Sequence, residues 1–407
     1  MSQERTQKNT TPKSRGEQIK LKRLRLNMTQ KELADAVGMP KFGDRTIRRW
    51  EKGESSPSEL ELRAILSFPE QIPFPNNSKA PYAMIDLFSG IGGTRLGFTS
   101  TGKVSVVFSS EIDKFSCKTY RANFGELPSG DITTLEACKI PDHNILVAGF
   151  PCQAFSMAGR KKGFDDVRGT LFFEIARILK AKKPDCFLLE NVKNLKNHKN
   201  GDTFKTIVSI LESLDYEVFF EVLAARDFGL PQNRERIYIV GFNREKLDTS
   251  NTFTFPKPSK HPVRLGDILE KRVSDKYTIS DTLWNGHRLR KEKNKNAGKG
   301  FGYSLFDEES PYVSTLSARY YKDGSEILID QNDKNPRKIT PREAARLQGF
   351  PEEFIIPVSD TQAYKQFGNS VAVPVVAAIA QKILSYLEAN KCPDKALPDK
   401  EVLNTEE

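Results

Sequence analysis

Apolar residues recur at helical spacing through the N-terminal part of the chain. Within residues 17–68, the stretches IKLKRLRL, TQKELADAVG, DRTIRRWEKG and PSELELRAIL predict four short helices. Thr29 followed by Glu32 predicts a capping box at the start of the second helix. Residues 1–16 are polar and basic and predict a disordered tail, and the proline-rich residues 69–81 predict a linker.

A different pattern begins at residue 82. Short apolar runs such as YAMIDLF, VSVVFSS, NILVAGF and RIYIVGF alternate with amphipathic stretches such as GTLFFEIARILKA. This alternation predicts that residues 82–242 form an α/β domain with a mostly parallel, doubly wound sheet. The rhythm fails over residues 243–336, which predicts an inserted domain, and helical patterning returns over 337–390 to complete the α/β domain. Residues 391–407 are a polar tail.

Charge and composition narrow the class of protein. Residues 1–80 hold 16 Lys and Arg against 10 Asp and Glu, so they carry +6 of the net charge of +10. This favours a polyanionic partner, although surface lysine alone often produces such a balance. The chain shows neither a run of roughly 18 apolar residues nor a signal peptide, so we expect a cytoplasmic protein without a membrane partner.

Cysteine and histidine are sparse. The 5 cysteines form no CxxC pair and the 4 histidines are scattered, so we expect neither a disulfide framework nor a metal site. One cysteine is unusual, because Cys152 directly follows Pro151 at the end of the apolar run NILVAGF. A thiol at a strand end is well placed to act as a nucleophile, but free cysteine is among the most buried residue types, so a core position is the commoner alternative.

The first apolar run of the α/β pattern leads into DLFSGIGGTRLGF. Gly90, Gly92 and Gly93 allow close backbone approach by a nucleotide-like cofactor at a helix N-terminus, and a tight turn alone explains them equally well. Glu111 lies about 20 residues further on, where a carboxylate can accept both hydroxyls of a ribose. Asp131 can accept a hydrogen bond from an adenine amino group. Each acid alone is more often a helix cap, but the series favours an adenosyl cofactor.

Six blocks follow one another along the chain: DLFSGIGG, GFPCQAFS, LLENVKNL, PQNRERIYIVGF, ITPREAARLQGFP and QFGNSVAVPVV. Together, over residues 82–390, they resemble the signature blocks of the DNA cytosine-5 methyltransferase family of type II restriction-modification systems. The resemblance implies the S-adenosylmethionine-dependent methyltransferase fold, S-adenosyl-L-methionine as cofactor and double-stranded DNA as partner. It makes residues 243–336 the target-recognition domain and implies a cognate restriction endonuclease encoded nearby.

The N-terminal helices resemble a second family. TQKELADAVG and RTIRRWEKG are similar to the helix-turn-helix of phage-repressor-like regulators, which implies DNA binding by residues 17–68 through Arg45 and Arg48. The turn between Gly38 and Trp50 is about three residues longer than that family's usual pattern. We expect the domain to repress its own operon, and a small oligomerisation module is the alternative.

The methyltransferase resemblance assigns chemistry to Cys152, Glu190, Arg234 and Arg236. Cytosine C5 is a poor nucleophile, so addition of the Cys152 thiolate to C6 is needed to make the ring electron-rich. Glu190 is the acid that supplies a proton as charge accumulates on N3, with helix capping as the alternative. Arg234 and Arg236 are expected to orient the catalytic loop and to contact the flipped base or its phosphates.

The resemblance also implies two sets of binding residues. The cofactor set comprises Asp86, Phe88, Gly90, Gly92, Glu111, Ile112, Asp131, Ile132, Pro151, Asn369, Ser370 and Val371. The DNA set of the methyltransferase part comprises Gln153, Ser156, Arg160, Arg319 and Lys322. Because stacked duplex DNA shields the reacting carbons, the target cytosine is expected to be flipped out of the helix.

Residues 298–330 resemble the recognition segment of family members that read short palindromes beginning with CC and ending with GG. Arg319 and Lys322 can each donate to guanine O6 and N7, with Tyr320 and Tyr321 packing alongside. This predicts CCGG or a slightly longer or interrupted relative as the target. A strand and turn whose basic groups touch only phosphates is the alternative.

Two other functions remain open from the sequence. An RNA cytosine-5 methyltransferase shares blocks of the ENV and PCQ type, but it does not need an inserted recognition domain together with a DNA-reading module. A catalytically silent DNA-binding regulator is the second alternative, and the intact residues Cys152, Glu190 and Arg236 speak against it. The absence of a DPPY-type block disfavours methylation of an amino group.

Overall fold

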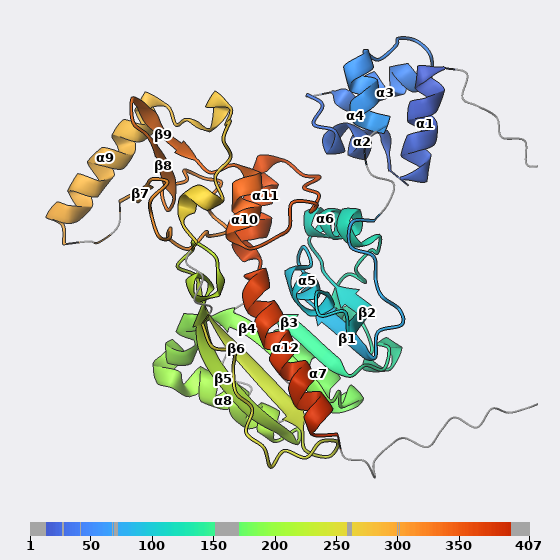
Figure 1. Cartoon of the computed structure of the whole chain (residues 1–407), viewed down its shortest axis with the longest axis vertical. Helices are drawn as coiled ribbons and strands as arrows, with labels where there is room; N and C mark the ends of the chain where they lie inside the picture. Colours follow the sequence, from blue (N-terminus) through green and yellow to red (C-terminus); the bar gives the residue numbers. More distant parts are fainter. Residues whose placement is uncertain are drawn as a thin grey trace, which may run out of the picture.

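The chain folds into a small helical domain followed by an α/β domain and a smaller region that carries a second sheet (Figure 1). The computed structural model describes residues 14–391 apart from positions 27, 41, 67, 69–71, 151–170, 259–262, 299 and 301. Pro151, Cys152, Gln153, Ser156 and Arg160 therefore lie outside the described residues.

The helical domain has the four helices that the apolar spacing predicts. They are α1 (Arg15–Arg25), α2 (Gln30–Ala36), α3 (Gly43–Glu51) and α4 (Glu59–Leu66). The predicted capping box is confirmed, because Thr29 Oγ1 accepts from the Glu32 backbone N–H at 3.2 Å and the Glu32 carboxylate accepts from the Thr29 N–H at 2.7 Å. Ile19, Ile47 and Trp50 pack in one core between the helices.

The α/β domain is built on a six-stranded sheet in the order β2-β1-β3-β4-β6-β5. The strands are β1 (Tyr82–Leu87), β2 (Val104–Ser110), β3 (Ile145–Gly149), β4 (Cys186–Val192), β5 (Tyr216–Ala224) and β6 (Glu235–Asn243). Strands β1 to β4 are parallel to one another, and β6 runs antiparallel to both β4 and β5. The prediction of a mostly parallel sheet is confirmed.

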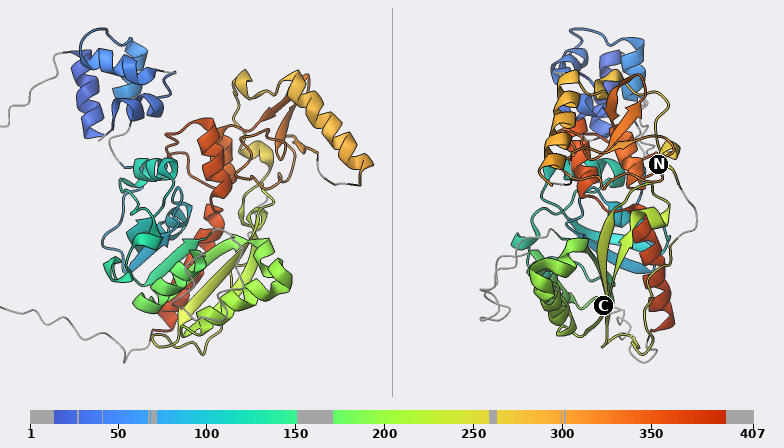
Figure 2. Two further views of the ribbon diagram at one scale, coloured as in Figure 1. Left: turned by 180° about the vertical axis from the view of Figure 1, so that it is seen from behind. Right: turned by 90° about the vertical axis from the view of Figure 1, so that its left-hand side faces the viewer.

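Helices cover both faces of this sheet, as the side view in Figure 2 shows. The helices of the domain are α5 (Gly93–Thr99), α6 (Lys114–Phe124), α7 (Leu171–Lys182), α8 (Asp202–Glu212), α11 (Asp360–Asn369) and α12 (Val373–Ala389). Met84 and Val147 pack in a core with α12, whereas Ile85 and Leu146 pack in a second core with α7 and α8. Burial on both faces explains why these strands are apolar along their whole length.

The stretch Asp360–Ala389 is apolar and long enough to cross a membrane by length and composition alone. However, 61% of its most apolar window is buried inside the protein. Ile379 and Ile383 of α12 are fully buried in the core of the α/β domain. We therefore interpret this stretch as core helices.

The inserted region carries a three-stranded sheet in the order β7-β8-β9 and one long helix. Its elements are α9 (Asp281–Asn296), β7 (Leu305–Phe306), β8 (Leu328–Gln331) and β9 (Lys334–Lys338), and α10 (Pro341–Leu347) follows. Short 3-10 helices are η1 (Ile132–Thr134), η2 (Ala137–Lys139), η5 (Lys193–Gly201), η6 (Ala225–Phe228), η7 (Leu265–Asp267) and η8 (Asp275–Tyr277). Leu247 and Phe253 pack in the core beside α12, so we propose that the inserted region begins after residue 255 instead of at 243.

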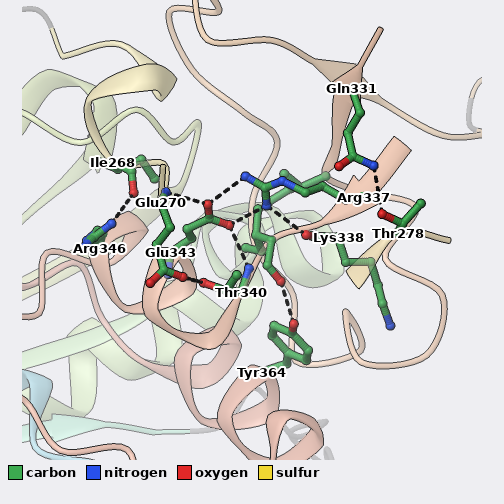
Figure 3. Close-up of polar contacts among 12 residues, drawn as sticks. Ile268, Glu270, Thr278, Gln331, Arg337, Lys338, Thr340, Glu343, Arg346 and Tyr364 are labelled. Carbon is green, nitrogen blue, oxygen red and sulfur yellow. Dashed lines mark hydrogen bonds and ion pairs between the residues drawn. The ribbon is translucent and has the colours of Figure 1, made fainter. Parts of the chain in front are cut away.

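A buried ion pair joins β9 of the inserted region to α10 (Figure 3), and α10 itself packs in a core with Ile91 and Leu96 of the α/β domain. Arg337 of β9 donates from both terminal nitrogens to the Glu343 carboxylate of α10, each at 2.8 Å. The same carboxylate accepts from the backbone N–H groups of Glu270 at 2.9 Å and Thr340 at 2.8 Å. These contacts tie the entry and the exit of the inserted region to one helix.

Candidate active site

A cavity of about 710 Å³ opens at the carboxyl ends of β1 to β4, where β6 begins. This is the edge at which open α/β sheets bind their ligands. Most of the predicted cofactor and catalytic residues that the structure describes line it: Phe88, Gly90, Glu111, Ile112, Asp131, Ile132, Glu190, Arg234, Arg236, Asn369, Ser370 and Val371. Asp86 and Gly92 do not line it.

The turn after β1 shapes one wall of the cavity. Gly90 adopts a φ of 54°, in the left-handed region that favours glycine, and a Cβ added there would meet no atom within 4 Å. The absent side chain therefore leaves room for a ligand against the backbone. Gly92 has another role, because a Cβ at this position would lie 2.2 Å from the Phe124 ring. Gly92 is needed for packing between the turn and α6.

The carboxylate of Glu111 is fixed by backbone donors. Its Oε2 accepts from the Gly90 N–H at 2.8 Å, and its Oε1 accepts from the N–H groups of Ile112 and Asp113, each at 2.8 Å. A carboxylate offers about four acceptor positions, so it retains capacity for hydroxyl groups of a ligand. Ile112 is 73% exposed on the cavity wall and offers an apolar surface beside this carboxylate.

Asp86 lies behind the turn, fully buried. Thr94 Oγ1 donates to both of its carboxylate oxygens, at 2.9 and 2.8 Å. Burial raises the pKa of Asp86 to about 7, against the opposing effects of the Thr94 hydrogen bond and Arg95. Because Thr94 itself lines the cavity, Asp86 supports the site from behind and does not face the ligand space.

Three polar side-chain atoms of residues in the cavity wall are buried without hydrogen-bond partners among the described residues: Ser110 Oγ, Arg234 Nε and Gln366 Nε2. The other end of the Gln366 amide accepts from Thr119 Oγ1 at 2.9 Å, which fixes its orientation. Buried polar atoms rarely stay unpaired in proteins. Together with the open space at Gly90, these atoms fit a ligand that is polar and carries both donors and acceptors.

Glu190 and Arg236 form the opposite side of the cavity. Arg236 Nε lies 3.1 Å from Glu190 Oε1, and their side chains are 15% and 13% exposed. Burial raises the pKa of Glu190, although Arg236 and Arg234 act in the opposite direction. Gly149 at the end of β3 pairs in register with Glu190, so the chain leaves β3 beside this carboxylate.

A family model described as C-5 cytosine-specific DNA methylase matches residues 82–385. The chain belongs to this family. A helix-turn-helix model matches residues 19–73. The type II methyltransferase M1.ScrFI of Lactococcus lactis subsp. cremoris is 70% identical over 92% of this chain and 96% of its own length, and M.SsoII of Shigella sonnei is 67% identical over 91% and 98%. The crystal structure of the S. pombe Dnmt2 methyltransferase shares the fold, with a TM-score of 0.61 and 22% identity over 76% of this chain and 99% of that one.

The predicted fold, enzyme class and helix-turn-helix domain are thus confirmed, and the family implies methyl transfer that depends on S-adenosylmethionine. In this DNA methylase, Arg234 is only 3% exposed. It donates to the backbone carbonyls of Leu316 at 3.2 Å, Gly368 at 3.2 Å and Ser370 at 2.5 Å. Burial lowers its pKa to about 9, with a further contribution from Arg236. Its hydrogen bonds hold the wall of the cavity together.

The methylase has three other cysteines in its described part, Cys117, Cys138 and Cys186. Cys186 is fully buried at the start of β4, at the far end of the strand from Glu190, and burial raises its pKa well above the ordinary thiol value. Burial also raises the pKa of Cys117, with contributions from nearby carboxylates. Neither environment favours a thiolate, which is the form that attacks carbon.

The predicted DNA contacts lie on two parts of the methylase. Arg319 and Lys322 are exposed in residues 317–324, which we call the recognition loop. Tyr320 is fully buried instead of packing beside a base, and its hydroxyl donates to the Ile327 carbonyl at 2.7 Å. Arg45 and Arg48 are exposed on α3 of the helix-turn-helix domain.

Two polar residues in or beside the site were not predicted from the sequence. Asn191 donates from Nδ2 to the Phe150 carbonyl at 2.9 Å and so anchors the end of β3. Gln232 donates to the Leu347 carbonyl at 2.8 Å and accepts from the Leu316 N–H at 3.0 Å. Asn191 follows Glu190 directly, and Gln232 belongs to the PQNRER block. Their positions in these blocks could have indicated that they lie close to the site.

Proposed function

We propose that this methyltransferase transfers a methyl group from S-adenosyl-L-methionine to C5 of a flipped cytosine in a short palindromic duplex site, and that it protects DNA from a cognate restriction endonuclease. The observation that carries this proposal is a single cavity with the Gly90–Glu111 turn on one wall and the Glu190–Arg236 pair on the other. The first wall fits an adenosyl cofactor, and the second fits a protonatable base.

The cofactor would supply an electrophilic methyl group. Glu111 would accept the ribose hydroxyls, Ile112 would cover one face of the adenine, and Asp131 would accept from its amino group. The open backbone at Gly90 and the unpaired Ser110 hydroxyl provide space and polarity for the remainder. These assignments agree with the donors and acceptors of the cavity wall.

Cys152 would act as the nucleophile towards the flipped base. Its thiolate forms a bond to C6, and the displaced electron pair makes C5 nucleophilic, with charge accumulating at N3. After C5 has gained the methyl group, loss of the C5 proton breaks the bond between sulfur and C6 and releases the thiolate. Phe150, two residues before Cys152 in the sequence, lines the same cavity as Glu190.

Glu190 would donate a proton towards N3 while the thiolate adds. A carboxyl group with an ordinary pKa is almost fully ionised at neutral pH and has little proton to give. The raised pKa of Glu190 increases the protonated fraction. Arg236, 3.1 Å away, would stabilise the carboxylate that remains after donation. Both properties suit an acid that returns to its starting state in each turnover.

The target would be CCGG or a slightly longer or interrupted relative. The exposed side chains of Arg319 and Lys322 in the recognition loop support this proposal, since a bidentate contact to guanine discriminates by about 1–3 kcal/mol. Arg319→Ala should therefore relax base preference more than it weakens nonspecific binding. An equal loss of affinity for every sequence, with a shallower salt dependence, would instead identify Arg319 as a phosphate contact.

The helix-turn-helix domain would repress the operon that encodes the enzyme. The exposed Arg45 and Arg48 lie on its α3, the helix that this motif places in a major groove. We further propose that the protein works in the cytoplasm, where its DNA substrate lies. Footprinting of the upstream region with the full chain and with a chain lacking residues 1–75 tests the regulatory role, and equal protection by both would reject it.

Bisulfite sequencing of DNA from an expressing cell tests the main proposal. We expect protected cytosines at one short sequence motif in cells with the wild-type chain and none in cells with Cys152→Ser. An unmodified genome in both cells would favour the catalytically silent regulator. Modified RNA with unmodified DNA would favour the RNA methyltransferase.

A further inference from the structure

Helix α9 is a basic element of the inserted region. Its 16 residues include 5 Lys and Arg against 2 Asp and Glu, which gives a net charge of +3. The helix extends away from the α/β domain (Figure 1 and Figure 2). Its second half is the polar stretch HRLRKEKNKN, to which neither the cofactor cavity nor the recognition loop gives a role.

Three basic side chains lie along one side of α9. Arg288, Lys291 and Lys295 are exposed and follow one another at spacings of three and four residues, which places them in a row on the helix surface. We call these three residues the basic row. Two aromatic rings border it, since Arg288 Cζ lies 5.7 Å from the centroid of the Trp284 ring and Lys291 Nζ lies 4.2 Å from that of the Tyr303 ring. The two rings meet edge to face, with centroids 4.8 Å apart.

The basic row keeps its positive charge. None of its three members forms an ion pair with a described residue, and Glu292, the one carboxylate in residues 287–296, forms none there either. The contacts of Arg288 and Lys291 with the aromatic rings orient these cations without neutralising them. The row therefore offers three cations to a partner that carries a line of negative charges.

Contacts on another side of α9 fix the helix to the recognition loop. Arg290 donates from Nη1 to the Asp323 carboxylate at 3.0 Å and from Nη2 to His287 Nδ1 at 2.9 Å. Because a guanidinium only donates, the proton of the buried His287 ring lies on Nε2, which donates to the Asp323 carbonyl at 3.3 Å. Asp323 directly follows Lys322 in the loop. A duplex read by the loop would therefore have a defined position relative to α9.

We propose that the basic row contacts phosphates of the DNA duplex outside the target site. Because α9 extends away from the α/β domain, which would hold the flipped base, the row would meet the flanking DNA. At 1.5 Å per residue the row spans about 10 Å, and about three base-pair steps of 3.4 Å cover the same length. Phosphate contacts carry no base information, so the row adds affinity without adding sequence preference. This inference rests on the proposed reading of duplex DNA by the recognition loop.

Salt titrations of DNA binding by the full chain test the proposal. Two duplexes contain the target site once, and the long one extends about one helical turn beyond it on each side, whereas the short one ends about two base pairs beyond it. The triple variant Arg288→Gln, Lys291→Gln and Lys295→Gln removes the charges of the row. Glutamine has nearly the helix propensity of lysine and arginine, so α9 should persist.

Each phosphate contact contributes about 0.9 to the slope of log affinity against log salt, so the wild-type slope on the long duplex should be steeper by about 2–3 than that of the triple variant. Between 50 and 200 mM salt the wild type should then lose about 40 times more affinity than the variant. On the short duplex the two proteins should have equal slopes. The preference for the target over a scrambled long duplex should be the same in both.

The matched control is the triple variant Lys79→Gln, Lys180→Gln and Lys382→Gln. It removes the same charge from exposed positions outside the inserted region and the helix-turn-helix domain, and it should keep the wild-type slopes. A second measurement needs no change to the protein. Methylphosphonates that replace the flanking phosphates of the long duplex should weaken wild-type binding about tenfold or more at low salt.

The inference is overturned by equal slopes of the wild type and the basic-row variant on the long duplex, by the same change of slope on the short duplex or in the control, or by methylphosphonates without effect. A merely structural role of α9 would weaken binding to both duplexes alike. Failure of the proposed function is a separate result, since it would show as absence of methylation and of any target preference on either duplex.

Discussion

Glu343→Gln is expected to weaken the joint between the inserted region and the α/β domain. Glu343 is fully buried and Arg337 is 6% exposed, so neither charge can turn to solvent when its partner is lost. The glutamine side chain has nearly the same shape, but its amide nitrogen cannot accept hydrogen bonds. The Arg337 guanidinium would thus remain buried without a counter-charge, and at least one of its N–H groups or a backbone N–H would lose its acceptor.

Removal of one partner from a buried ion pair destabilises by about 3–5 kcal/mol, and we expect Glu343→Gln to fall in this range. Arg337→Met should cost a similar amount, whereas the double variant should cost clearly less than the sum of the two. The protein has 2 tryptophans, Trp50 and Trp284. In a Trp50→Phe background, urea unfolding followed by fluorescence therefore reports Trp284 on α9 of the inserted region.

This reasoning would be refuted if each single variant lost less than about 1 kcal/mol of unfolding free energy and the two losses were additive. Losses of this size are typical of exposed ion pairs. The inserted region would then be held by its apolar contacts alone. Arg264→Ala is the matched control, since its ion pair with Glu309 is exposed and its removal should change the midpoint little.

Three further predictions concern the site and the N-terminal domain. Asp86 in the folded protein keeps its proton up to a pKa of about 7, whereas the unfolded chain releases it near pH 4, so the wild type should lose stability as the pH rises through this window. In thermal unfolding, Asp86→Asn should lose less stability than the wild type between about pH 5 and about pH 8. An equal loss of stability in the two proteins would contradict the prediction. Glu190→Gln should slow single-turnover methyl transfer by about 10²–10⁴ while DNA binding persists, and an unchanged rate would exclude the proton-donor role. Deletion of residues 1–75 should leave methylation largely intact. Loss of methylation would instead show that the helix-turn-helix domain contributes to catalysis.

Local patterns in the sequence predicted much of the fold. The β-branched apolar runs became parallel strands because both faces of the sheet are covered, and the Thr29–Glu32 spacing formed the predicted capping box. Glu111, at the end of the second apolar run, and Glu190, in the block LLENVKNL, line one cavity. Strand ends of a parallel sheet meet at one edge, so residues that follow different strands converge without any further information.

The remaining features depend on contacts between distant segments. Tyr320 stands in the polar stretch SARYYKDG and is buried because it packs in a core with residues from distant segments, among them Tyr364 of α11. Arg234 directly precedes β6 and Arg236 is the second residue of that strand, yet the acceptors of Arg234 belong to residues 316, 368 and 370. For the same reason, the glycine motif did not reveal that Gly92 contacts Phe124 and turns away from the cavity.

The central claim is that Cys152 forms a covalent bond to C6 of a flipped cytosine. A duplex that carries 5-fluorocytosine at the target position tests it most directly, because fluorine cannot leave C5 as a proton does and the adduct persists. With S-adenosylmethionine present, we expect a stable protein–DNA complex whose peptide map places the adduct on Cys152, and no complex with Cys152→Ser. An adduct on Cys117 or Cys186, or no adduct while an ordinary duplex is methylated, would contradict the account.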